Sequence, residues 1–184
     1  MSHAGPEAVL FPYAVLVDQR EKAPYSFTGL LADAREGRKP LRIVTRTKKL
    51  ETGDYALAGL EDVIAVEKKT LPDLYHTLGQ ARGRFERELT RLSAMEVAAV
   101  VVEAEWSTIL NHPPETSQLP PKVVFRSVLA WQQQFPTIHW WFVDGRRPAE
   151  VVTFRILERF ARRRQETRRP KQKRKQEDVR QGES

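Results

Sequence analysis

Short segments with strand character and longer segments with helical spacing follow one another along most of the chain. The run 97–102 is apolar at every position, as strands buried on both faces are. The runs 54–58 and 63–67 are separated by a short turn that contains Gly59, and this pattern predicts a hairpin. The segments with strand character are 13–17, 41–46, 54–58, 63–67, 97–102 and 138–143.

Apolar residues at helical spacing predict four helices, and one of them has a clear start. Leu71, Leu74 and Leu78 fall on one helix face. Thr70 and Asp73 fit a capping box, in which each side chain bonds the backbone N–H of the other residue. Strands and helices in this order predict an α/β fold with a central mixed β-sheet flanked by helices. The predicted helices cover 71–78, 84–95, 123–134 and 151–161.

The positive charge is concentrated near the carboxyl end. The 184 residues carry a net charge of +7. Residues 159–175 contain ten Arg or Lys and one Glu, a balance of +9, so the rest carries about −2, the difference between +7 and +9. Apolar residues almost vanish from residue 162 onward. We predict a flexible leader over 1–12, one folded domain over 13–161, and a basic disordered tail over 162–184 that suits nucleic acid or serves only solubility.

Composition excludes several classes of protein. The chain has no cysteine, which excludes a disulfide framework and a thiolate metal site and fits a reducing compartment. No apolar run approaches the roughly 20 residues that span a bilayer, so we expect no membrane partner. The first residues lack a basic segment followed by a long apolar core, so we expect no signal peptide.

Two acids and a lysine stand at the ends of the predicted hairpin strands. Asp54 opens the first strand, Glu67 closes the second, and Lys69 follows two residues later. Alternation along a strand places Glu67 and Lys69 on one face and Lys68 on the other. Two carboxylates hold a hard cation, Mg²⁺ or Mn²⁺, which lowers the pKa of a bound water, and an ammonium orients that water or stabilises charge on phosphorus. If the strands pair, this set suits phosphodiester hydrolysis.

A third acid follows the first predicted strand. Asp18, Arg20 and Glu21 come directly after the run 13–17, at the sheet end expected to hold Asp54. In the functional interpretation, Asp18 helps to bind the metal or orients its ligands, and Arg20 forms part of a charged wall that holds phosphate. The alternative is a solvated turn after a strand.

This central stretch resembles the nuclease motif of the XPF-type structure-specific endonucleases, within the PD-(D/E)xK restriction-endonuclease-like superfamily. The family pattern is Gly-Asp, a variable spacer, Glu-Arg-Lys, three residues and Asp. This chain has Gly53-Asp54, the spacer, Glu67-Lys68-Lys69, three residues and Asp73. Lys68 replaces the family's arginine, which keeps the positive charge but loses the planar bidentate fork. For Asp73 we place the capping role first and a catalytic role second.

Two flanking segments extend the resemblance, which covers about residues 13–160. The segment 18–21 matches the family's D-x-R-E motif, and 83–85 resembles the G-R-F start of its next helix, in which Glu88 stands near a position where the family often has glutamine. The resemblance implies a restriction-endonuclease-like fold, and a DNA endonuclease that acts on branched or flap DNA in repair or recombination. It implies a catalytic set that consists of Asp18, Asp54, Glu67 and Lys69. It also implies DNA contacts by Arg20, Lys68, Arg84 and Arg87.

Several alternatives stay open. For Arg84 and Arg87 the alternative is a solvated helix face, which we prefer for Arg87. A non-catalytic DNA-binding or scaffold subunit of a nuclease complex is the first rival function, and a restriction- or lesion-type nuclease on the same core is the second. The resemblance also implies a homodimer or heterodimer through the C-terminal part of the domain. We expect a cytoplasmic, nucleoid-associated protein in a bacterium and a nuclear one in a eukaryote.

Overall fold

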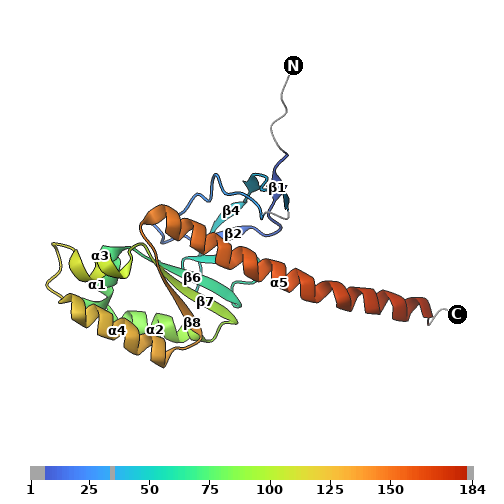
Figure 1. The fold of residues 1–184 in the computed structure, drawn as a ribbon. Coiled ribbons are helices and arrows are strands. Elements are labelled where there is room, and N and C mark those ends of the chain that lie inside the picture. Colours follow the sequence, from blue (N-terminus) through green and yellow to red (C-terminus); the bar gives the residue numbers. More distant parts are fainter. Residues whose placement is uncertain (1–6, 34–35, 182–184) are drawn as a thin grey trace, which may run out of the picture.

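A six-stranded mixed sheet forms the centre of the computed structural model, which describes residues 7–33 and 36–181, with side chains described up to Thr167. The strand order is β4-β2-β5-β6-β7-β8 (Figure 1). β2 is parallel to β4 and antiparallel to β5, β5 is antiparallel to β6, and β6, β7 and β8 are parallel to one another. The strands are β2 (Val15–Asp18), β4 (Thr45–Lys48), β5 (Tyr55–Leu57), β6 (Ile64–Lys69), β7 (Val97–Val102) and β8 (Ile138–Phe142).

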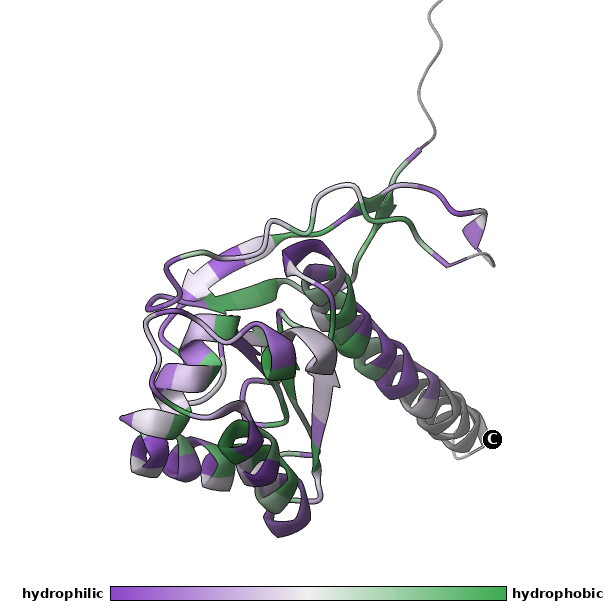
Figure 2. Cartoon of the chain, turned by 60° about the vertical axis from the view of Figure 1, so that its left-hand side comes forward, coloured by the Kyte–Doolittle hydropathy of each residue, from purple (hydrophilic) through white to green (hydrophobic). Residues whose placement is uncertain are grey.

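Helices cover both faces of this sheet, which confirms the predicted α/β fold. Alternation along β7 sends Val100 into a core beneath α1, α2, α3 and α4, and Val101 into a second core beneath α5 (Figure 1). Figure 2 shows hydrophobic residues on the part of α5 that lies against the sheet. The helices are α1 (Leu71–Gly79), α2 (Arg82–Ser93), α3 (Trp106–Asn111), α4 (Pro121–Gln134) and α5 (Arg146–Gln181).

The start of α1 is the predicted capping box. The Asp73 N–H donates to Thr70 Oγ1 (3.2 Å), and the Thr70 N–H and hydroxyl both donate to Asp73 Oδ2. α1 ends at Gly79, and α2 begins at Arg82 after a break of two residues. The predicted helix start is therefore confirmed, and the second helix begins two residues earlier than the sequence indicates.

Three local features differ from the sequence-based expectation. The predicted strand 41–46 is split into β3 (Leu41–Arg42) and β4, because β3 leaves the main sheet to pair in parallel with β1 (Val9–Leu10). The expected leader over 1–12 is wrong for its last residues, since Phe11 is buried and its ring lies 5.1 Å from that of Phe154 on α5. The short helix α3 has no counterpart in the prediction; residues 1–6 lie outside the described residues.

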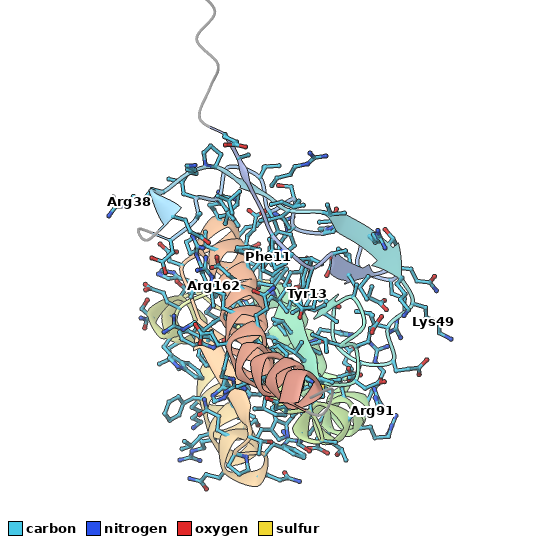
Figure 3. All side chains as sticks on the ribbon, turned by 90° about the vertical axis from the view of Figure 1, so that its right-hand side faces the viewer. Phe11, Tyr13, Arg38, Lys49, Arg91 and Arg162 are labelled. Atoms are coloured by element: carbon cyan, nitrogen blue, oxygen red, sulfur yellow. The ribbon has the colours of Figure 1, made fainter. Side chains whose placement is uncertain are left out.

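The expected disordered tail over 162–184 is also revised. α5 continues without interruption to Gln181, and residues 182–184 lie outside the described residues. Arg162, which lies near Phe11 (Figure 3), contacts Glu36 (2.7 Å) and Glu158 (3.0 Å). Arg164 contacts Glu96 (2.8 Å). Arginine, lysine and glutamine are good helix formers, and these ion pairs extend the folded body beyond the predicted boundary. In the described ranges, no helix has the length and apolar character needed to cross a membrane.

Candidate active site

The β5–β6 hairpin brings Asp54 next to Glu67. In the antiparallel pair of β5 and β6, Tyr55 faces Val66. Asp54, the residue before Tyr55, therefore lies opposite Glu67, the residue after Val66. The Asp54 N–H donates to the Val66 carbonyl (2.9 Å), and Asp54 Oδ2 accepts from the Lys68 backbone N–H (2.7 Å). The hairpin and the convergence of the two acids, both expected from the sequence, are therefore present.

The turn before Asp54 requires glycine. Gly53 has φ +73°, in the left-handed region, and a Cβ added there would lie 2.9 Å from the Ala65 Cβ and 3.3 Å from the Val66 carbonyl oxygen. Only a residue without a side chain lets the chain turn this close to β6. Glycine at the first position of the Gly-Asp pair thus allows the tight turn that places the Asp54 carboxylate next to the end of β6.

Glu67 and Lys69 point to the same face of β6, as alternation predicts. Lys69 Nζ donates to Glu67 Oε1 (2.5 Å) and lies 4.6 Å from the centroid of the Phe85 ring on α2. Burial opposes the charge on Lys69, but the adjacent Glu67 carboxylate outweighs it and raises the pKa of Lys69. Lys69 is therefore an ammonium at neutral pH, suited to orienting water or stabilising anionic charge rather than to accepting a proton.

Asp54 lies where its own charge is costly. Burial and, after it, the Glu67 carboxylate raise the pKa of Asp54 well above the usual range, although the Lys68 N–H and Lys69 partly oppose this. A divalent cation would relieve this repulsion. Among the described residues, no three Asp, Glu or His side chains form a metal-binding cluster. Two carboxylates with the remaining positions left to water and phosphate are a donor set that fits Mg²⁺.

Asp18 does not join this pair as an open ligand. Its carboxylate is buried and accepts four hydrogen bonds, from the Arg20 backbone N–H (2.8 Å), from Arg20 Nε (2.7 Å) and Nη2 (3.1 Å), and from the Leu50 N–H (2.7 Å). The Asp18 N–H donates to the Asp54 carbonyl (2.8 Å). Direct metal binding by Asp18 is therefore not supported, because protein donors occupy its carboxylate, and its second expected role, orienting the metal ligands, stays a prediction.

Most of the guanidinium N–H groups of Arg20 donate hydrogen bonds within the protein. Besides Asp18, its Nη2 donates to the Leu50 carbonyl (2.8 Å), yet its side chain is 63% exposed. The hydrogen bond to Asp18, together with the nearby Glu88 and Asp54 carboxylates, raises its pKa further. Arg20 is a fixed, exposed cation beside the acidic pair, and its predicted contact with phosphate stays a prediction.

Lys68 is not available to DNA. Its side chain is 4% exposed and points to the opposite face of β6, where Nζ contacts Glu21 Oε1 (3.0 Å) and the Ala23 carbonyl (2.9 Å) and lies over the Tyr25 ring. The expected DNA contact is wrong because alternation turns this lysine into the protein. Glu21 is paired with it beneath the site and raises the pKa of Asp54.

Arg84 and Arg87 lie on the first turns of α2, whose residue Phe85 packs against Lys69. Both arginines are exposed and form no ion pair within the described residues. They are free to contact a phosphate, and the choice between that role and a solvated face stays open.

Glu88 is a site residue that the sequence did not assign. Its Oε1 accepts hydrogen bonds from the Gly53 N–H (2.9 Å) and the Thr52 hydroxyl, and its Oε2 contacts Arg91. The only signal in the sequence was its position one turn after Phe85 in α2, where the related family often has glutamine. Its contact with the Thr52–Gly53 turn depends on the tertiary fold.

The α/β domain thus has a mixed sheet with two carboxylates and a lysine at the ends of the adjacent strands β5 and β6. The model of the ERCC4 domain family matches residues 17–153. The chain belongs to the ERCC4 domain family. A comparison with curated protein sequences gives no match.

Eighteen chains of solved structures match this chain. XPF from Aeropyrum pernix is similar with a TM-score of 0.58 and 22% identity, over 85% of this chain and 69% of that chain. XPF from Aeropyrum pernix in complex with DNA is similar with a TM-score of 0.53 and 20% identity, over 82% of this chain and 66% of that chain. These likenesses show that this chain shares the fold of XPF from Aeropyrum pernix.

Proposed function

We propose that the protein is a Mg²⁺- or Mn²⁺-dependent endonuclease that hydrolyses phosphodiester bonds in DNA. The observation that carries this proposal is the convergence of Asp54, Glu67 and the Lys69 ammonium at one end of β6, in a chain of the ERCC4 domain family. Both acids and the lysine are present together, with a glycine turn and a buried hydrogen-bond network that hold the first acid in place.

Each residue has a distinct part in the proposed reaction. Asp54 and Glu67 would hold the cation, which when bound polarises the phosphate and acidifies a water. Lys69, already an ammonium beside Glu67, would orient the attacking water and stabilise the negative charge that develops on phosphorus. Asp18 would keep the backbone of Asp54 in position. Arg20 and Arg84, both exposed, would hold the scissile strand through its phosphates.

The substrate we propose is branched or flap DNA in repair or recombination, in a nucleoid or nuclear location. XPF from Aeropyrum pernix has a solved structure in complex with DNA, and its fold is shared by this chain. The basic stretch from Arg159 to Lys175 supports nucleic-acid binding whose affinity falls with salt. We also propose dimerisation through the C-terminal part of the domain, where Trp141 on the edge strand β8 is 45% exposed.

The rival function is a non-catalytic, DNA-binding subunit. Members of this kind would be expected to lose the acids, and the retention of Asp54, Glu67 and Lys69 speaks against it. The Glu67→Ala variant should bind DNA with nearly unchanged affinity and lose cleavage by more than 100-fold. DNA that is cut equally by both proteins would contradict the assignment of Glu67. DNA that is bound but cut by neither would favour the scaffold role.

A panel of labelled substrates separates the proposed structure-specific nuclease from a restriction- or lesion-type nuclease. Plain duplex, 3′ flap, 5′ flap, fork and single-stranded DNAs of unrelated sequence would be compared at one salt concentration. We expect cleavage near the junction of a flap or fork and little cleavage of plain duplex. Cutting of plain duplex at a fixed sequence would contradict the branched-DNA proposal.

A further inference from the structure

The Thr52–Gly53 turn is tied to helix α2 by one carboxylate. Glu88 Oε1 accepts from both the Gly53 N–H (2.9 Å) and the Thr52 hydroxyl, while the exposed Arg91 contacts Oε2. Thr52 is itself buried, at 5% exposure. The two donors lie immediately before Asp54 in the chain and the acceptor lies on α2, so the contact with α2 fixes the position of the turn from which Asp54 follows.

On the sheet side, the turn lies directly against β6. Gly53 adopts φ +73° and lies so close to β6 that an added Cβ would sit 2.9 Å from the Ala65 Cβ. Asp54, the next residue, is held against β6 by the hydrogen bond from its N–H to the Val66 carbonyl (2.9 Å). Glu88 therefore holds the turn from α2, while the Asp54–Val66 bond holds the following residue against β6.

We propose that Glu88 is a positioning residue for the cation-binding pair, a role that rests on the proposed nuclease function. By holding Thr52 and Gly53, Glu88 keeps Asp54 at the distance from Glu67 at which both carboxylates bind one divalent cation. Groups that orient metal ligands without touching the metal typically change metal affinity 10–100-fold when they are removed. Glu88 acts through the turn and does not contact the cation.

The chain offers a matched set of variants. Glu88→Ala removes the acceptor. Glu88→Gln keeps an oxygen that can accept from Thr52 and Gly53, and Arg91 is exposed enough to turn away from the new amide. Glu86→Ala is the control on the same helix, because Glu86 contacts Arg82 (3.1 Å) and the Trp131 Nε1 (3.1 Å) instead of the turn.

The test measures Mn²⁺ affinity without DNA, by the electron paramagnetic resonance signal of free Mn²⁺, with Asp54→Ala as the reference for loss of the site. We expect Glu88→Ala to weaken Mn²⁺ binding by about 10–100-fold, and Glu88→Gln and Glu86→Ala to stay within about 3-fold of the wild type. Thermal unfolding of each variant measures whether the fold is retained. If Glu88→Ala does not fold, Thr52→Val, which removes one of the two donors, is expected to weaken binding by several-fold.

The outcomes separate the two proposals. Wild-type protein that binds Mn²⁺ no better than Asp54→Ala would overturn the proposed metal site itself. Wild-type binding that depends on Asp54 but is unchanged in Glu88→Ala would overturn only the positioning role. An equal loss in Glu86→Ala and Glu88→Ala would also overturn it, because general weakening of α2 would then explain the effect.

Discussion

Asp54 is a residue whose charged form is disfavoured in the native state. Burial and the adjacent Glu67 disfavour its charged form, while the fold holds it in place through Gly53 and the Lys68 N–H. A group whose folded pKa lies above its unfolded value weakens the native state as the pH rises through that range. The free energy of unfolding should therefore contain a penalty from Asp54 at neutral pH.

We expect Asp54→Asn to raise the free energy of unfolding by about 1 kcal/mol at pH 8, a rise in Tm of about 2–4 °C. The asparagine oxygen can still accept from the Lys68 N–H, and the repulsion with Glu67 is removed. The two proteins should become equally stable as the pH falls toward 4. Thermal unfolding in EDTA at a series of pH values measures this difference, and a less stable variant at pH 8 would contradict it.

Asp18 has the opposite electrostatic character. Burial opposes its charge, but hydrogen bonds from the Arg20 side chain and from the Leu50 and Arg20 N–H groups outweigh burial and lower its pKa. Its contribution to stability is present above the unfolded pKa and is lost as the pH falls through the folded pKa. The ionised carboxylate therefore stabilises the native state at neutral pH.

We expect Asp18→Ala to lower the free energy of unfolding by about 2–4 kcal/mol at pH 7, because the buried Leu50 N–H loses its partner. The difference from wild type should shrink below about pH 4. The exposed Asp62 provides the control, since Asp62→Ala should change stability by less than about 0.5 kcal/mol. Urea unfolding at both pH values tests this; a loss that does not depend on pH would contradict it.

The sequence predicted the elements better than it predicted their boundaries. The hairpin, the buried β7 and the capped start of α1 follow from local patterns of alternation and capping, and the structure has all three. The split of 41–46 and the pairing of Val9–Leu10 depend on contacts between segments about 30 residues apart, which no local pattern contains.

The capping box at the start of α1 allows the two roles of Asp73 to be separated. Asp73→Ala should lower the free energy of unfolding by about 1 kcal/mol, because the helix loses its cap. Asp73→Glu keeps a capping carboxylate and should restore most of this stability. DNA cleavage should stay within a few-fold of wild type in both variants. A loss of cleavage above 100-fold in a stable Asp73→Glu protein would show a catalytic role instead.

Local sequence patterns likewise predict only part of the candidate site, because some of its contacts depend on the assembled fold. Asp54, Glu67 and Lys69 could be predicted to converge because one hairpin and the alternation along one strand bring them together. The partners of Lys68 and Glu88 could not, because Glu21 and the Thr52–Gly53 turn reach them only through the packing of the N-terminal segment and α2. The saturation of Asp18 by Arg20 and Leu50 is likewise a property of the assembled fold.

At the scale of the molecule, the sheet that carries the two acids and the lysine is followed by the long helix α5, which packs on the sheet and then extends beyond it (Figure 1). The sequence of this helix is rich in Arg and Lys. The site would supply the chemistry, and the exposed arginines and the basic helix would supply attraction for nucleic acid. This division predicts that salt weakens binding while substitutions of the acids remove cleavage.

The most direct test is cleavage of a labelled flap DNA by wild type and Asp54→Ala, side by side in Mg²⁺, Mn²⁺ and EDTA. We predict cutting by the wild type with either metal, none in EDTA, and none by the variant, with DNA binding retained in both proteins. Cutting by wild type in EDTA, or equal cutting by a folded Asp54→Ala protein, would contradict the proposed metal-dependent mechanism.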